Sequence, residues 1–146
     1  MKVNMNIDYK SPGTLEKTRY EKIHSVIFDE SKEASRIVAI EIAKLIKKKQ
    51  KENKKCVLGL ATGSSPISVY NELVRMHKED GLSFSNVITF NLDEYFPMKN
   101  NDIQSYHYFM HLHLFSHIDI KPENINIPNG EIKVTNIDKY CDEYEI

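Results

Sequence analysis

Two short polar stretches of this 146-residue chain carry the residue types that could do chemistry. The first reads Thr62-Gly63-Ser64-Ser65-Pro66 and offers a glycine, three hydroxyl groups and, if a helix follows, the free N–H groups of its first turn. Together these donors suit a phosphate group. No lysine follows the glycine as in a Walker A loop, and the chain contains no G-x-G-x-x-G motif. The stretch is therefore a candidate phosphate site, with an ordinary capped turn between a strand and a helix as the alternative.

The second stretch is the segment NLDEY at 91–95, which directly follows the apolar run 87–90. A carboxylate at the end of a strand, partly shielded from water, can act as a general base, and Asp93 is the candidate. An adjacent Asp and Glu more often cap a helix or lie in a solvated loop, which is the competing interpretation. Asp93 is favoured because the phosphate-type loop is expected to end beside it.

The elements that must position these two stretches are indicated by the residues around them. The run Cys56–Leu60 is apolar without polar alternation, which is typical of a strand buried on both faces of a parallel sheet. Ser65 as the N-cap and Pro66 in the first turn predict a helix that ends at Gly81. The run 87–90 predicts a second strand, and a crossover of this length joins parallel strands. Ligands of such a unit lie outside the carboxyl ends of its strands, where both polar stretches are expected.

The remaining sequence predicts an arm and several further elements. Residues 1–20 are polar and show no helical or strand periodicity, so we expect an N-terminal arm followed by an α/β domain at 21–146. Tyr106 lies on the apolar side of one expected helix, and Cys141 is expected to face inward beside Tyr144 in the last one. The other predicted elements are a strand at 25–28, a helix from Asp29 or Ser31 to about Lys49, a helix from Asp102 or Ser105, an extended segment within 118–130 and a helix from Thr135 or Asn136.

The composition argues against several classes of partner. Twenty basic and twenty-one acidic residues give a net charge of −1, so we expect no nucleic acid and no anionic membrane as a partner. The chain has neither the apolar core of a signal peptide nor an apolar run of membrane-spanning length. Cys56 and Cys141 are expected to be reduced, which favours the cytoplasm.

His107 and His111 have the spacing of helical metal ligands, but no third ligand follows, so aromatic packing is favoured over zinc.

Five segments together resemble a known family: GLATGSSP, ELVRMHKEDGLSF, VITFNLDEY, QSYHYFM and HIDIKPENINIPNG. In this order and spacing they resemble the N-terminal half of glucosamine-6-phosphate deaminase, of the sugar-phosphate isomerase/deaminase superfamily. The resemblance runs from about Phe28 to the last residue. It implies an α/β fold with a parallel-sheet, Rossmann-like, three-layer arrangement, truncated after its first strands and helices. It also implies a small sugar phosphate as substrate, no cofactor, no metal, and a homo-oligomer in the full-length family.

The resemblance also implies roles for individual residues. Glucosamine 6-phosphate would be converted to fructose 6-phosphate and ammonia, with Asp93 matching the carboxylate that moves the C2 proton. Gly63, Ser64 and Ser65 match the loop that binds the 6-phosphate. The supporting residues of the two motifs are Thr62, Glu94 and Tyr95.

The second catalytic segment of the family is absent from the chain. That segment carries the ring-opening histidine and its acidic partners, and each positioned proton transfer contributes roughly 10²–10⁴-fold in rate. We therefore expect little or no turnover by this chain alone, and a marginally stable or associating fold because the sheet keeps an open edge. The alternatives are a 6-phosphogluconolactonase or pentose-phosphate isomerase relative, a sugar-phosphate-binding module without catalysis, and a non-functional remnant.

Overall fold

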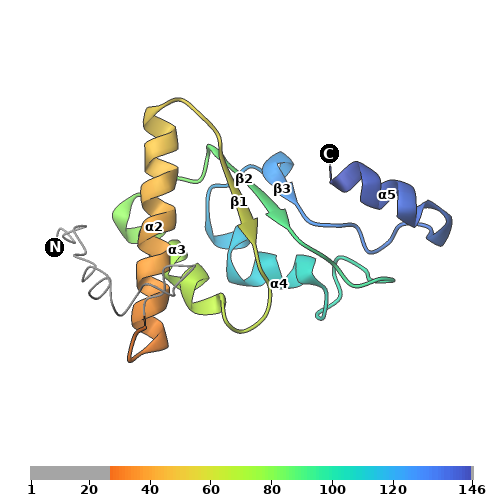
Figure 1. The fold of residues 1–146 in the computed structure, drawn as a ribbon, viewed down its shortest axis with the longest axis horizontal. Helices are drawn as coiled ribbons and strands as arrows, with labels where there is room; N and C mark the ends of the chain where they lie inside the picture. Colours follow the sequence, from red (N-terminus) through yellow and green to blue (C-terminus); the bar gives the residue numbers. More distant parts are fainter. Residues whose placement is uncertain (1–26, 146) are drawn as a thin grey trace, which may run out of the picture.

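The computed structural model describes residues 27–145, and its described helices and strands form one α/β unit (Figure 1). The helices are α2 (Ser31–Lys51), α3 (Ile67–Asp80), α4 (Tyr106–His113) and α5 (Ile137–Tyr144), and the strands are β1 (Cys56–Leu60), β2 (Val87–Asn91) and β3 (Ile125–Asn126). Short 3₁₀ turns lie at Phe115–His117, Pro122–Asn124 and Val134–Asn136. The arm predicted at 1–20 lies outside the described residues. The strand predicted at 25–28 overlaps them only at Ile27 and Phe28, which are not in a strand.

The sheet has the order β1-β2-β3, and both strand pairs are parallel. The register pairs Cys56 with Val87 and Leu60 with Asn91, so β1 and β2 end side by side. Between them α3 makes the crossover and ends at Gly81, which adopts the left-handed conformation with φ 68°. The predicted βαβ unit is therefore confirmed.

The predicted helix caps are only partly confirmed. Ser105 caps α4 as predicted, because its side chain accepts a hydrogen bond from the Tyr108 N–H. The predicted cap of α3 at Ser65 is wrong, since the helix begins one residue later and Pro66 occupies the N-cap position. A preceding turn, in which the Ile67 N–H donates to the Ser64 carbonyl at 3.4 Å, already includes Ser65.

The start of α2 and the inner face of α5 also differ from the sequence expectations. The N-cap of α2 is Glu30, without a side-chain hydrogen bond, rather than Asp29 or Ser31. Cys141 is exposed instead of inward-facing, whereas Tyr140 and Tyr144 are half-buried. α5 touches the rest of the molecule along a narrow stripe, and Cys141 lies outside it.

One face of the sheet carries the hydrophobic core. Side chains alternate along a strand, so Cys56 and Leu60 of β1 and Val87 of β2 point to the same face. There they pack against α2, α3 and α4 in a single buried cluster. Its helical members are Ala39, Ile40, Ala43, Ile46, Tyr70, Leu73, Met76 and Met110.

The opposite face of the sheet is largely open within the described residues. Val57 is 60% exposed and Phe90 is 40% exposed, so the prediction that β1 is buried on both faces is wrong for this part of the chain. Tyr144 of α5 reaches that face, where its ring meets the Phe90 ring edge-on with a centroid distance of 6.2 Å. In Figure 1, α5 accordingly lies apart from α2 and α3.

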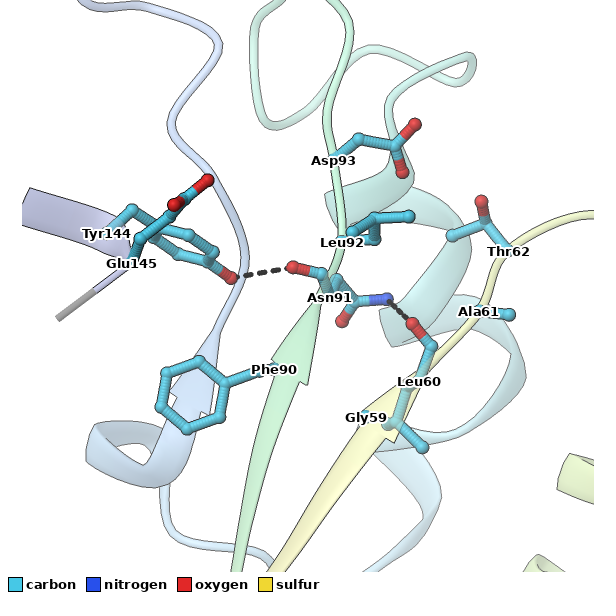
Figure 2. A pocket seen from close by; sticks show the side chains of 10 residues that line it. All are labelled: Gly59, Leu60, Ala61, Thr62, Phe90, Asn91, Leu92, Asp93, Tyr144 and Glu145. Atoms are coloured by element: carbon cyan, nitrogen blue, oxygen red, sulfur yellow. Dashed lines mark hydrogen bonds between the residues drawn. The ribbon is translucent and has the colours of Figure 1, made fainter. Parts of the chain in front are cut away.

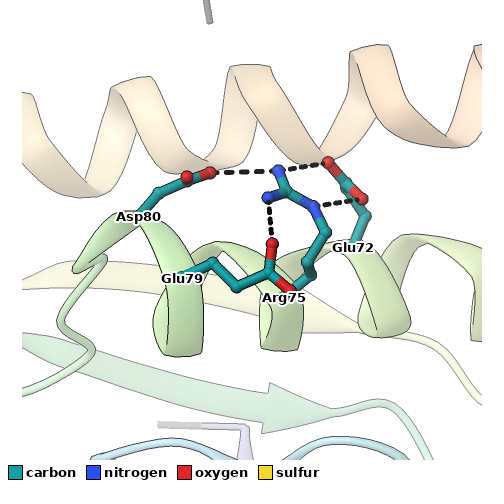
Figure 3. Close-up of polar contacts among 4 residues, drawn as sticks. All are labelled: Glu72, Arg75, Glu79 and Asp80. Carbon is teal, nitrogen blue, oxygen red and sulfur yellow. Dashed lines mark hydrogen bonds and ion pairs between the residues drawn. The ribbon is translucent and has the colours of Figure 1, made fainter. Parts of the chain in front are cut away.

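A group of ion pairs within α3 centres on one arginine. Arg75 of α3 bonds the carboxylates of Glu72, Glu79 and Asp80 at 2.8–3.0 Å (Figure 3). These are exposed or partly exposed pairs, each of which contributes little to stability in water.

No helix within residues 27–145 has the length and apolarity needed to cross a membrane.

Asp119 ties the loop after α3 to the segment before β3. Its carboxylate accepts hydrogen bonds from the Ser83 hydroxyl at 2.6 Å and from the Phe84 N–H at 2.5 Å. Burial alone would raise the pKa of Asp119, but these two bonds, with His77 nearby, lower it below its usual value. The contact therefore favours the charged carboxylate.

Candidate active site

A pocket of about 810 Å³ opens at the carboxyl ends of β1 and β2. Its walls come from the end of β1, the end of β2 and the end of α5 (Figure 2). The lining residues are Gly59, Leu60, Ala61, Thr62, Phe90, Asn91, Leu92, Asp93, Tyr144 and Glu145. The pocket lies where parallel α/β sheets hold their ligands, which is the place expected from the sequence.

Two of the predicted site residues meet in this pocket. Asp93 follows β2, Thr62 follows β1, and Figure 2 shows both side chains at the same end of the pocket. Asp93 is exposed, so the expected partial shielding of this carboxylate from water is absent in the described part of the chain.

The other predicted phosphate-loop residues lie beside the pocket rather than in its wall. Gly63, Ser64 and Ser65 are all exposed and lead directly into α3. Gly63 has φ 96°, a backbone conformation that glycine adopts without strain. The loop thus offers hydroxyl groups and the N-terminal N–H groups of a 14-residue helix to a ligand bound outside β1.

Glu94 holds the start of α4. Its carboxylate accepts hydrogen bonds from the N–H groups of Tyr106 and His107, each at 2.9 Å. A negative charge at a helix N-terminus is favourable because it satisfies free N–H groups and opposes the helix dipole. Glu94 therefore anchors α4 next to Asp93, which for this residue is the helix-capping role of the competing interpretation.

Tyr106 is a candidate site residue that the sequence pattern assigned to the apolar side of α4. Its ring packs on that of Tyr95 with a centroid distance of 4.8 Å. Hydrogen bonding with the Tyr95 hydroxyl raises the pKa of Tyr106, a hydrogen bond with Thr62 lowers it in part, and the charge of Asp93 adds to the rise. The Tyr106 side chain is therefore packed on Tyr95 and is close enough to Thr62 and Asp93 for both to influence its pKa. In the sequence, the position of Tyr106 directly after the predicted N-cap Ser105 could have indicated that it lies at the start of the helix, near the polar stretches.

The histidines of α4 pack rather than gather as ligands. The rings of His107 and His111 lie 4.6 Å apart between centroids, and His111 also meets Phe115 edge-on. Burial, followed by the neighbouring His107, lowers the pKa of His111. Among residues 27–145, no three His, Cys, Asp or Glu side chains come together to hold a metal ion.

The chain is similar to a defined family of sugar-phosphate enzymes. Residues 29–146 match the family model described as glucosamine-6-phosphate isomerases/6-phosphogluconolactonase. A glucosamine-6-phosphate deaminase of Thermoanaerobacter sp. (strain X514) is 50% identical over 103 residues, which are 70% of this chain and 40% of that protein.

Solved structures agree with this assignment. The structure of a monomeric glucosamine-6-phosphate deaminase superposes with a TM-score of 0.75 at 41% identity, covering 81% of this chain and 46% of that one. A 6-phosphogluconolactonase from Thermotoga maritima superposes with a TM-score of 0.61 at 23% identity, covering 76% of this chain and 47% of its own, and shares the fold. The chain thus spans less than half the length of each of these proteins.

Proposed function

Since the chain belongs to the family of glucosamine-6-phosphate isomerases and 6-phosphogluconolactonases, we propose that it carries the first half of a glucosamine-6-phosphate deaminase active site. The observation that carries the proposal is the meeting of Asp93 with Thr62 in one pocket, at the ends of two adjacent parallel strands. The higher identity to deaminases than to lactonases favours the deaminase among the family's activities.

In this proposal the loop after β1 binds the phosphate of an open-chain sugar phosphate, and Asp93, which follows β2, transfers its proton. The 6-phosphate would lie against Gly63, Ser64 and Ser65, where hydroxyl and N-terminal N–H groups supply donors. Asp93 would remove the proton from C2 and return it at C1, as a general base and then a general acid. The resulting imine would react with water to release ammonia and fructose 6-phosphate.

The exposure of Asp93 limits what the chain would do alone. A general base works best where neighbouring groups exclude water and hold the substrate within hydrogen-bond reach. Within the described residues, the open sheet face leaves one side of the pocket to solvent, so we expect substrate binding to be weak and turnover to be negligible. A homo-oligomer, a cytoplasmic location and the absence of nucleic acid partners stay predictions from the sequence.

The test is a chimera that supplies the rest of the fold. The 146 residues are joined to the part of the Thermoanaerobacter deaminase that lies beyond its matched region, and ammonia release from glucosamine 6-phosphate is measured. We expect turnover by the chimera, a loss of at least about 10²-fold in the Asp93→Asn variant, and none in the chain alone. The matched control is Asp29→Asn, at an exposed aspartate outside the pocket.

Three results would contradict the proposal. Hydrolysis of 6-phosphogluconolactone without ammonia release would assign the chain to the lactonases. Binding of fructose 6-phosphate without any turnover would favour a sugar-phosphate-binding module. Equal activity of the wild-type and Asp93→Asn chimeras would remove Asp93 from the chemistry.

A further inference from the structure

Two consecutive backbone carbonyls at the end of β1 are each bound by a buried side chain from another element. The Asn91 amide Nδ2, at the end of β2, donates to the Leu60 carbonyl at 3.2 Å (Figure 2). The Tyr70 hydroxyl, in the first turns of α3, donates to the Ala61 carbonyl. Tyr70 and Asn91 are each only 2% exposed. These bonds come from both sides of the crossover and meet just before Thr62.

The loop that follows has few constraints of its own. Its residues 63–65 are exposed, and within the described structure one backbone hydrogen bond closes it, from the Ile67 N–H to the Ser64 carbonyl at a long 3.4 Å. A loop with exposed backbone and few bonds belongs to the low-stability part of a fold. Its position must therefore be set at its base, where Tyr70 and Asn91 act.

We propose that Tyr70 and Asn91 are positioning residues for the sugar-phosphate site. Tyr70 fixes the start of the loop to α3, whose N-terminus would face the phosphate, and Asn91 fixes it to β2, which carries Asp93 two residues later. Tyr70 and Asn91 would together set the distance between the phosphate loop and the general base Asp93. This inference rests on the proposed function for its ligand.

The chemistry of both side chains suits this role. Burial raises the pKa of Tyr70 to about 12, so its hydroxyl keeps its proton and goes on donating. Asn91 Oδ1 has no hydrogen-bond partner among the described residues, and turning the amide over would place this oxygen against the Leu60 carbonyl. The donor contact to Leu60 therefore selects one orientation of the amide.

The test uses ¹⁵N relaxation of the 146-residue chain and its Tyr70→Phe and Asn91→Leu variants. In the wild-type chain we expect order parameters near about 0.85 for the Gly63 and Ser64 amides, falling below about 0.6 in each variant. Amides of α2 should be unchanged. The matched control is Tyr140→Phe, which removes a hydroxyl that accepts from the Asn129 N–H at 2.7 Å, away from the loop.

The inference is overturned if the wild-type loop is already disordered, if neither variant changes its order parameters, or if the whole chain loosens uniformly. In the chimera, Tyr70→Phe should raise KM for glucosamine 6-phosphate by about 3- to 10-fold, the effect of one hydrogen bond, with a smaller change in kcat. A fall in kcat alone would contradict positioning of the phosphate loop. An inactive wild-type chimera would count against the proposed function only, because the relaxation measurement needs no turnover.

Discussion

Removal of the Glu94 carboxylate should destabilise the start of α4 and disturb the pocket beside it. The carboxylate accepts three hydrogen bonds, from the N–H groups of Tyr95, Tyr106 and His107, all at 2.9 Å. Two of these N–H groups belong to the first turn of α4, where no carbonyl within the helix can accept them. Glu94→Ala would leave them to water or without a partner.

The magnitude follows from the burial of these groups. A hydrogen bond to a charged acceptor contributes about 1.5–3 kcal/mol when buried, but Tyr106 and His107 are only half-buried, so water replaces part of the loss. Ser105 still caps the Tyr108 N–H, which keeps the helix from unravelling. We therefore expect Glu94→Ala to cost about 2 kcal/mol and Glu94→Gln about 1 kcal/mol, because the amide keeps one acceptor oxygen.

Urea unfolding monitored by far-UV circular dichroism measures these free energies. The near-UV circular dichroism of this chain, which has eight tyrosines and no tryptophan, includes a contribution from the packed Tyr95–Tyr106 pair, and the signal should weaken in Glu94→Ala. Glu131→Ala, at an exposed glutamate, is the matched control and should change stability by less than about 0.5 kcal/mol. If Glu94→Ala were as stable as this control, the assignment of Glu94 as the anchor of α4 would be refuted.

Three further predictions concern the Asp119 contact, the close approach at Gly130 and the open sheet face. Folding lowers the pKa of Asp119, so the charged carboxylate stabilises the fold above the usual pKa of 3.8, and this stabilisation is lost as the pH falls through the lower pKa of the folded state. Asp119→Asn should therefore make the urea midpoint depend less on pH in the acid range. A Cβ at Gly130 would lie 2.6 Å from the Tyr95 carbonyl oxygen, so Gly130→Ala should cost about 1–3 kcal/mol in urea unfolding, and an unchanged midpoint would contradict the close approach. Val57→Asp should reduce self-association in sedimentation velocity, whereas Val134→Asp, at another exposed valine, should not.

The sequence alone predicted those parts of the fold that depend on neighbouring residues in the chain. The apolar runs that became β1 and β2, the Pro66 start and the Gly81 stop predicted a parallel βαβ unit, and the structure has it. Short apolar runs and helix-stop residues are signals that act over a few residues, so no knowledge of distant contacts is needed. The pairing of Leu60 with Asn91 then brings the two polar stretches to one pocket.

The features that the sequence did not predict depend on contacts between distant residues. Tyr106 has the residue type and spacing of a core position, and only the anchoring of α4 by Glu94 brings it beside Thr62. Cys141 has the helical spacing of an inward residue, but α5 contacts the sheet through too narrow a stripe to cover it. The sequence placed Asn91 directly after the strand predicted at 87–90, and its hydrogen bond to the Leu60 carbonyl becomes apparent only when the register is known.

The open sheet face and the exposed base border the same pocket, which both Phe90 and Asp93 line. Among the described residues, α2, α3 and α4 pack on one face, so Val57 and Phe90 on the other face are exposed to solvent. Asp93, beyond the end of β2, is exposed as well. A polypeptide that buried Val57 and Phe90 would gain hydrophobic free energy and would, by the same movement, close the solvent side of the pocket around Asp93. Completion of the fold and activation of the base are thus expected to occur together, so chimera variants that weaken packing at Val57 should lose ammonia release in proportion to lost stability.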